Sequence, residues 1–81
     1  MNIGLQSPSF KYPGGSPAIR PNLKEMVTTA EAGGFYSLWV MDHYYQIKGH
    51  FGEAYHDPML EAYTTLGYFA GLTKKAYLGV M

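Results

Sequence analysis

The run from Phe35 to Met41 constrains the fold most, because it is apolar on both faces and does not alternate between apolar and polar residues. A strand with that pattern is typical of a parallel sheet that other layers cover on each side. Parallel strands must be joined by crossover connections, which are usually helices. The run therefore predicts the central strand of an α/β fold.

Hydrophobic periodicity places further elements on both sides of this strand. It predicts a first strand over residues 2–7, a helix from about residue 22 to 32, a second helix over about 57–72 and a last, buried strand over 76–81. The order strand, helix, strand, helix, strand with short returns from helix to strand is a repeated right-handed βαβ unit. It predicts three parallel strands.

The first helix has recognisable signals at both ends. We expect Asn22 and Glu25 to form a capping box at its start, with Glu31 on a solvated face, and Gly33 and Gly34 to end it. Its buried stripe is predicted from the i, i+3, i+4, i+7 spacing of Leu23, Met26, Val27 and Ala30.

The second helix begins with a different signal. Asp57 is the predicted cap, and Pro58 fits the first helical position, where the missing amide is not needed. A face of mostly small residues is expected to lie against the sheet: Leu60, Tyr63, Gly67, Ala70 and Gly71.

The two connections that lead from strand to helix, residues 9–20 and 44–56, are long, whereas the returns are short. This asymmetry favours a (β/α)8 barrel, in which the loops after the strands carry the chemistry. A doubly wound sheet is the competing fold, but no G-x-G-x-x-G follows the first strand, and Gly14-Gly15 lies too far from it. The expected fold class is the amino-terminal β-α-β-α-β portion of a (β/α)8 barrel, with residues 1–81 forming a single partial domain.

Composition agrees with a partial domain and excludes several functions. Only 15% of the 81 residues are charged and 47% are hydrophobic, against about 25% charged in a typical soluble domain. Six basic and six acidic residues give a net charge of zero, which argues against a nucleic-acid partner. The absence of cysteine excludes a disulfide framework, and no apolar run approaches the length of a membrane span. We expect a cytoplasmic chain with no membrane partner.

Asp42 and His43, directly after the central strand, are the most informative candidate site residues. A histidine at a strand end can transfer a proton or hydrogen-bond a bound ring, and a neighbouring carboxylate can bias its charge. The alternative is a structural role, in which the histidine only caps backbone groups at the strand end. No metal site is expected, because the spacings of the candidate ligands match no helical pair: Asp42, His43, His50, Glu53, His56 and Asp57.

Aromatic residues crowd the loop that follows His43. Their rings would suit a planar ligand, or they could cover the end of a barrel or contact a partner subunit. These residues are Tyr44, Tyr45, Phe51 and Tyr55. Trp39, inside the strand, is expected in the core.

Six short segments, in this order and spacing, resemble the amino-terminal quarter to third of the luciferase-like monooxygenase superfamily, and most closely its coenzyme F420-dependent oxidoreductases. They are GLQ at 4–6, PSF at 8–10, AEAGGF at 30–35, SLWVMDH at 37–43, DPMLEA at 57–62 and LGVM at 78–81. The resemblance implies a (β/α)8 barrel that moves a hydride between F420, or alternatively FMN, and a small organic substrate.

The resemblance also implies roles for single residues. It makes His43 the catalytic residue beside the cofactor ring and adds Asp42, Ser9, Val80 and Met81 as cofactor-binding residues. The strands that supply most contacts to the phosphate tail in the family have no counterpart here, so the isolated chain is expected to bind cofactor weakly or not at all. The alternative hypothesis is a non-catalytic barrel remnant that forms a homo-oligomer or joins the missing remainder of the barrel through its open sheet edges.

Overall fold

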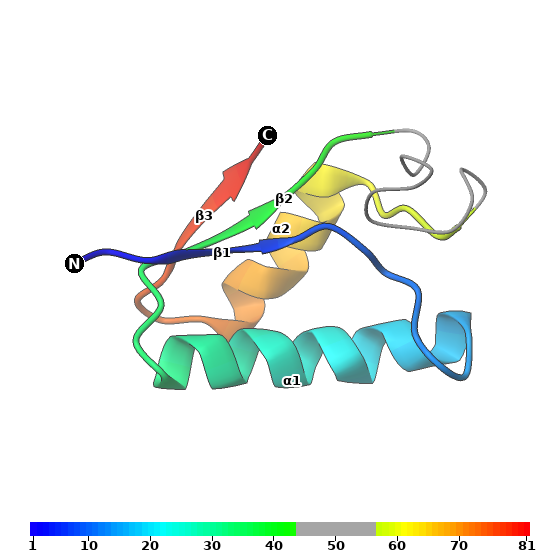
Figure 1. Ribbon diagram of the computed structural model, residues 1–81, viewed down its shortest axis with the longest axis horizontal. Helices are drawn as coiled ribbons and strands as arrows, with labels where there is room; N and C mark the ends of the chain where they lie inside the picture. The colour runs from blue at the N-terminus through cyan, green and yellow to red at the C-terminus, as the bar shows by residue number, and fades with distance from the viewer. Residues whose placement is uncertain (44–56) are drawn as a thin grey trace.

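A computed structural model describes residues 1–43 and 57–81 of the chain (Figure 1). Its elements are, in chain order, β1 (Gly4–Ser7), the 3-10 turn η1 (Ser16–Ala18), α1 (Ile19–Ala32), β2 (Ser37–Val40), α2 (Ala62–Leu72) and β3 (Tyr77–Val80). The fold is a mixed α/β arrangement of one parallel sheet and two helices, as the hydrophobic pattern predicts.

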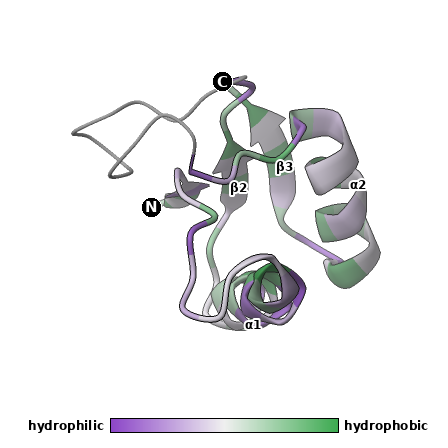
Figure 2. Ribbon diagram, turned by 90° about the vertical axis from the view of Figure 1, so that its right-hand side faces the viewer, coloured by the Kyte–Doolittle hydropathy of each residue, from purple (hydrophilic) through white to green (hydrophobic). Residues whose placement is uncertain are grey.

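The sheet has the order β1-β2-β3, and both pairs of neighbours are parallel. Leu5, Leu38 and Leu78 lie at the same level across the three strands. The apolar run at 35–41 is therefore the central strand, as predicted. Both helices lie on one face of the sheet (Figure 2). This is the arrangement expected when right-handed crossovers add each strand on the same side of the last.

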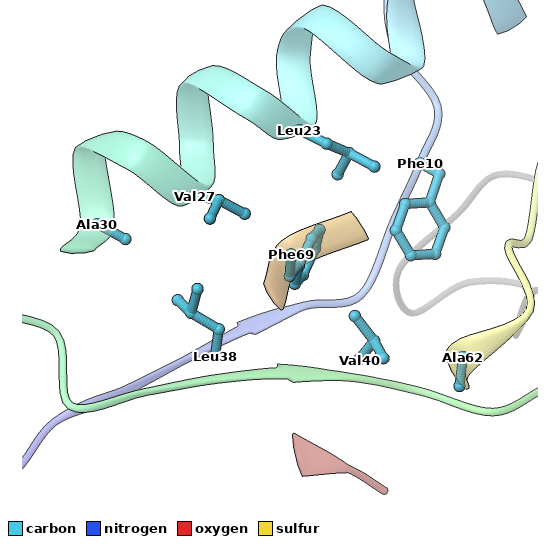
Figure 3. Close-up of a cluster of buried hydrophobic side chains, with 8 residues drawn as sticks. All are labelled: Phe10, Leu23, Val27, Ala30, Leu38, Val40, Ala62 and Phe69. Atoms are coloured by element: carbon cyan, nitrogen blue, oxygen red, sulfur yellow. The ribbon is translucent and has the colours of Figure 1, made fainter. Parts of the chain in front are cut away.

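The core lies between that face and the helices (Figure 3). Leu38 and Val40 of β2 point toward the helices and are 1% and 0% exposed. Phe10, in the connection after β1, is also buried in this core, so that connection is anchored to the fold. The helices contribute the remaining buried side chains of the cluster: Leu23, Val27, Ala30, Ala62 and Phe69.

Helix α1 has the predicted stripe but a different start. Leu23, Val27 and Ala30 are buried and Met26 is half-buried. The helix begins at Ile19, so the expected capping box is wrong: the side-chain amide of Asn22 donates to the carbonyl of Ala18 at 2.8 Å. The early start is possible because Pro21 lies in the first turn, where its missing N–H would have no helical acceptor. Gly34, at φ +90°, ends the helix as predicted.

Helix α2 differs from expectation in both start and face. It begins at Ala62, and Glu61, not Asp57, is its cap; the Glu61 carboxylate accepts the N–H groups of Tyr63 and Thr64 at 2.8 and 2.9 Å. The predicted packing face is also wrong, because four of its five residues are exposed: Tyr63, Gly67, Ala70 and Gly71. The fully buried Phe69 determines the rotation of the helix, since burying such a ring contributes about 1.5–3 kcal/mol, whereas a glycine has no side chain to bury.

The other face of the sheet has no helix over it among the described residues (Figure 2). Trp39 lies there with 37% of its surface exposed, which corrects its expected place in the core. Strand β3 is half-buried and its Tyr77 is 62% exposed, so the expected buried strand is wrong as well. The reason is the same for both: two helices on one face leave the opposite face uncovered.

Candidate functional site

The candidate site lies where the carboxyl ends of the three parallel strands meet. We call this end of the sheet the carboxyl edge, as distinct from the outer sides of β1 and β3. The ladder between β2 and β3 continues past both strands: the N–H of Met81 donates to the carbonyl of Val40 at 3.0 Å, and the N–H of Asp42 donates to the carbonyl of Met81 at 3.3 Å. The backbones of Asp42 and Met81 are thereby held together while both residues remain exposed. Two residues predicted from different strands meet at this edge.

His43 directly follows this paired backbone and is exposed. A neutral imidazole has one nitrogen that donates and one that accepts a hydrogen bond, and its protonated form donates from both. An accessible imidazole beside a carboxylate can therefore exchange a proton with a bound molecule or hydrogen-bond it.

Ser9 follows β1, the third strand end at this edge. Its hydroxyl oxygen accepts the backbone N–H of Lys11 at 3.3 Å, and the residue is half-buried. The neighbouring Phe10 is 1% exposed and fixes this part of the connection to the core. The Ser9 hydroxyl has one O–H that remains able to donate.

Val80 has a different orientation from the other predicted site residues. It is the register partner of Val40, and its half-buried side chain packs against the hydrophobic core. Successive side chains of a strand point to opposite faces, so the side chain of Met81 faces away from the helices. A ligand at this edge could contact Val80 only through its backbone.

One ion pair near this edge could not be predicted from the sequence. The ammonium nitrogen of Lys11 lies 3.5 Å from a carboxylate oxygen of Asp57, whose side chain is only 7% exposed. The pair joins the connection after β1 to the segment that leads into α2. No local pattern links residues 46 positions apart, and the single sequence signal, Asp before Pro, is also typical of a helix cap.

Several predicted site features lie outside the described residues: Tyr44, Tyr45, His50, Phe51, Glu53, Tyr55 and His56. Within residues 1–43 and 57–81, no three histidines or carboxylates gather closely enough to hold a metal ion.

Glu31, which is expected on a solvated face, lies at the opposite end of the sheet, where the strands begin. Its carboxylate accepts several hydrogen bonds there. It accepts the backbone N–H groups of Lys75, Lys74 and Ala76 at 2.6, 2.7 and 3.0 Å. These hydrogen bonds, that of Lys75 first, hold the pKa of Glu31 below its ordinary value. Glu31 therefore ties the end of α1 to the turn before β3, which makes it a structural residue.

A groove of about 440 Å³ lies between the two helices and is one of several concave features of the described surface. Ile19, Leu23, Leu60 and Tyr68 give it an apolar floor, and Arg20 lies among the residues that line it. None of the predicted site residues lines this groove. It lies on the helical layer, away from the strand ends.

The geometry defines an α/β protein whose parallel sheet brings an exposed imidazole and carboxylate to its carboxyl edge. Comparison with models of known protein families, with curated proteins and with solved structures finds no match for this chain. No helix in the described part of the chain has the length and apolar character needed to cross a membrane.

Proposed function

We propose that this chain is the amino-terminal portion of a (β/α)8 barrel oxidoreductase of the luciferase-like type, which transfers a hydride between coenzyme F420, or alternatively FMN, and a small organic substrate. The observation that carries the proposal is the backbone pairing of Asp42 with Met81 at the carboxyl edge of a parallel sheet, with the exposed His43 directly after Asp42. Barrel enzymes and open α/β proteins both bind their ligands at this edge.

The strand order narrows the choice of fold. Consecutive strands added in one direction, with both helices on one face, begin a (β/α)8 barrel and also one half of a Rossmann sheet, but not a flavodoxin-like sheet, where the first strand is central. The connection after β1 favours the barrel over the Rossmann half. It runs from Ser7 to η1 without the glycine pattern that brings a helix N-terminus to a pyrophosphate.

The composition of the helix-free face also favours the barrel. The second layer of helices in a doubly wound sheet packs on strands rich in Val, Ile and Leu. The strand residues on this face are instead Gly4, Gln6, Ser37, Trp39, Tyr77 and Gly79. Small and large residues that alternate across neighbouring strands are typical of the filled interior of a small barrel.

The residues at the edge fit a planar redox cofactor in their chemistry. His43 would hold or move a proton beside the ring, Asp42 would place its carboxylate next to that imidazole, and Ser9 would donate a hydrogen bond from the end of β1. Met81 would offer an apolar contact and Val80 its backbone. The cofactor itself supplies the hydride chemistry when bound.

Nuclear magnetic resonance of the labelled chain tests the proposal, because it detects the weak binding that we expect. Adding F420 at millimolar concentration should shift the ring signals of His43 and the amide signals of Asp42 and Met81, and FMN is compared at the same concentration. The amide of Tyr63, on the exposed face of α2, serves as the internal control. Shifts that are absent at His43, or that are as large at Tyr63, would refute the proposed site; tight 1:1 binding in an absorbance titration would refute the expectation of weak binding.

A second candidate function has its own observation in support. Within residues 1–43 and 57–81, β1 and β3 each pair on one side only, and the helix-free face exposes Trp39 and Tyr77. Unpaired strand edges and exposed apolar side chains favour association. The second candidate is therefore a non-catalytic barrel remnant that self-associates or joins a complementary fragment, and size-exclusion chromatography tests it, since a clean monomer at all concentrations would contradict it.

A further inference from the structure

The indole of Trp39 lies at the centre of the helix-free face of the sheet. We define the Trp39 face as the strand residues that point away from the helices: Gly4, Gln6, Ser37, Trp39, Tyr77 and Gly79. A Cβ added to Gly79 would lie 2.7 Å from Cη2 of Trp39, and one added to Gly4 would lie 3.2 Å from its Nε1. The indole therefore lies flat across the sheet, over the backbones of both neighbouring strands.

The orientation of this ring is also fixed by a hydrogen bond. The indole Nε1 donates to the Ser37 hydroxyl oxygen at 2.8 Å. Tyr77 is held in turn by the ring of Tyr36, with ring centroids 4.9 Å apart. Rigid aromatic side chains lose little conformational entropy when they are covered, so they give contact area at low cost.

The Trp39 face has the composition of the centre of a protein interface. Such centres are enriched in Trp and Tyr and depleted of charge. None of the three strands contains a charged residue. The register partner of Trp39 on β3 is Gly79, which has no side chain, whereas its partner on β1 is Gln6. The indole is therefore open toward β3, and the surface suits a broad partner better than an enclosed small molecule.

The absence of charge on this face is compatible with a second copy of this chain as the partner. In a two-fold dimer the same surface lies on both subunits, so any charge near the axis would oppose its equal. The Trp39 face has no such charge, and the net charge of zero removes long-range repulsion between copies. We propose that two copies pack their Trp39 faces against each other. This inference rests on the second candidate function and names the surface that it uses.

The size of the surface predicts a weak dimer. Four residues at about 3.3 Å and three strands at about 4.8 Å give a footprint of roughly 190 Å², well below the ~800 Å² per partner of a stable complex. We therefore expect association that depends on concentration and that high salt does not weaken, because no charge pair contributes to it.

Sedimentation velocity and fluorescence, measured over the same concentration series of the full chain, test the proposal. The mass should rise from 9.0 kDa toward twice that value. The emission of Trp39, the single tryptophan of the chain, should move to shorter wavelength with the same midpoint. Association without a change in Trp39 emission would overturn the proposed surface and leave self-association standing, whereas a monomer throughout would overturn both.

Two matched tyrosines provide the variant test. Tyr77→Lys places a positive charge on each copy at the Trp39 face and should shift the midpoint at least tenfold to higher concentration. Tyr63→Lys, at a residue 68% exposed on α2 against 62% for Tyr77, should leave it unchanged. Circular dichroism establishes that both variants fold, and Gln6→Lys on β1 replaces Tyr77→Lys if that variant does not. An equal loss of association in Tyr63→Lys would overturn the proposal.

Discussion

The two faces of the sheet show two different ways in which one set of strands is used. On the helix side, Leu38 and Val40 are fully buried against both helices. On the other side, Trp39 and Tyr77 remain exposed, and the close contacts there are between an indole and two glycine backbones. The helix side therefore provides most of the burial that stabilises the fold, and the Trp39 face provides an ordered surface that no helix of the described residues covers.

This difference explains how so short a chain can form an ordered parallel sheet. A domain of this size buries only about 60% of its unfolded surface, so its core must be concentrated. Phe10, Phe69 and the α1 stripe concentrate it on one face of the sheet. The other face can then differ in composition without the loss of the fold, which leaves it available for a partner or for the rest of a barrel.

The largest expected effect is on the helix side. Phe69→Ala removes a fully buried ring and should lower the free energy of unfolding by about 3–5 kcal/mol. A chain of this length has about 4–12 kcal/mol in total, so much of the variant should be unfolded at 37 °C. Urea denaturation followed by circular dichroism measures the change.

The matched control for Phe69→Ala is Tyr63→Ala on the exposed face of the same helix. It should change the free energy of unfolding of the monomer by no more than about 0.5 kcal/mol. Similar losses in the two variants would mean that α2 does not pack on the sheet through the face described above.

A smaller effect is expected on the Trp39 face. Gly79→Ala brings a methyl group into the indole of Trp39, and the displacement should reduce the free energy of unfolding by about 1–3 kcal/mol and change Trp39 emission. Gly67→Ala is the control: a Cβ there meets nothing within 4 Å, and removing a helix glycine should stabilise by about 1 kcal/mol. A neutral Gly79→Ala would show that the indole is not held flat.

The sequence was sufficient to predict the architecture of the sheet. The run at 35–41 predicted the central strand, and the spacing of Leu23, Val27 and Ala30 predicted the buried stripe of α1. Both are signals that repeat over many residues, so single errors do not change them. The parallel edge that brings Asp42 close to Met81 follows from the same strand order.

The start and face of α2 could not be predicted, because both depend on competition between residues. Asp57 and Glu61 can each cap a helix that follows Pro58, and only the packed structure shows that Asp57 pairs with Lys11 instead. The small-residue face and the face of Phe69 are both compatible with the sequence. The amount of surface that each buries decides between them, and that amount depends on the tertiary fold.

The role of Glu31 also depends on the tertiary fold and could not be predicted from the sequence. It leads to a prediction on the pH dependence of stability. Its folded pKa is lowered by the N–H groups of Lys75, Ala76 and Lys74, so its stabilising contribution is complete above the ordinary glutamate pKa of about 4.3 and is lost as pH falls through the folded pKa. Glu31→Gln should lower the melting temperature at pH 7, by less than Gly79→Ala does. The difference from the wild-type chain should shrink below about pH 4.3. A constant difference down to pH 2 would show that the carboxylate charge is not involved.

The smallest expected effect concerns the hydrogen bond that orients Trp39. Ser37→Ala removes the acceptor of the indole N–H, which lies 2.8 Å from the Ser37 hydroxyl oxygen, and should cost about 0.5–1 kcal/mol. The cost is modest because the half-exposed indole can donate to water instead. Its steady-state fluorescence anisotropy at low chain concentration should fall, since the ring then moves more freely. Unchanged anisotropy would mean that Gly4 and Gly79 alone fix the ring, and the flatness of the Trp39 face would then come from the two glycines and not from the hydroxyl.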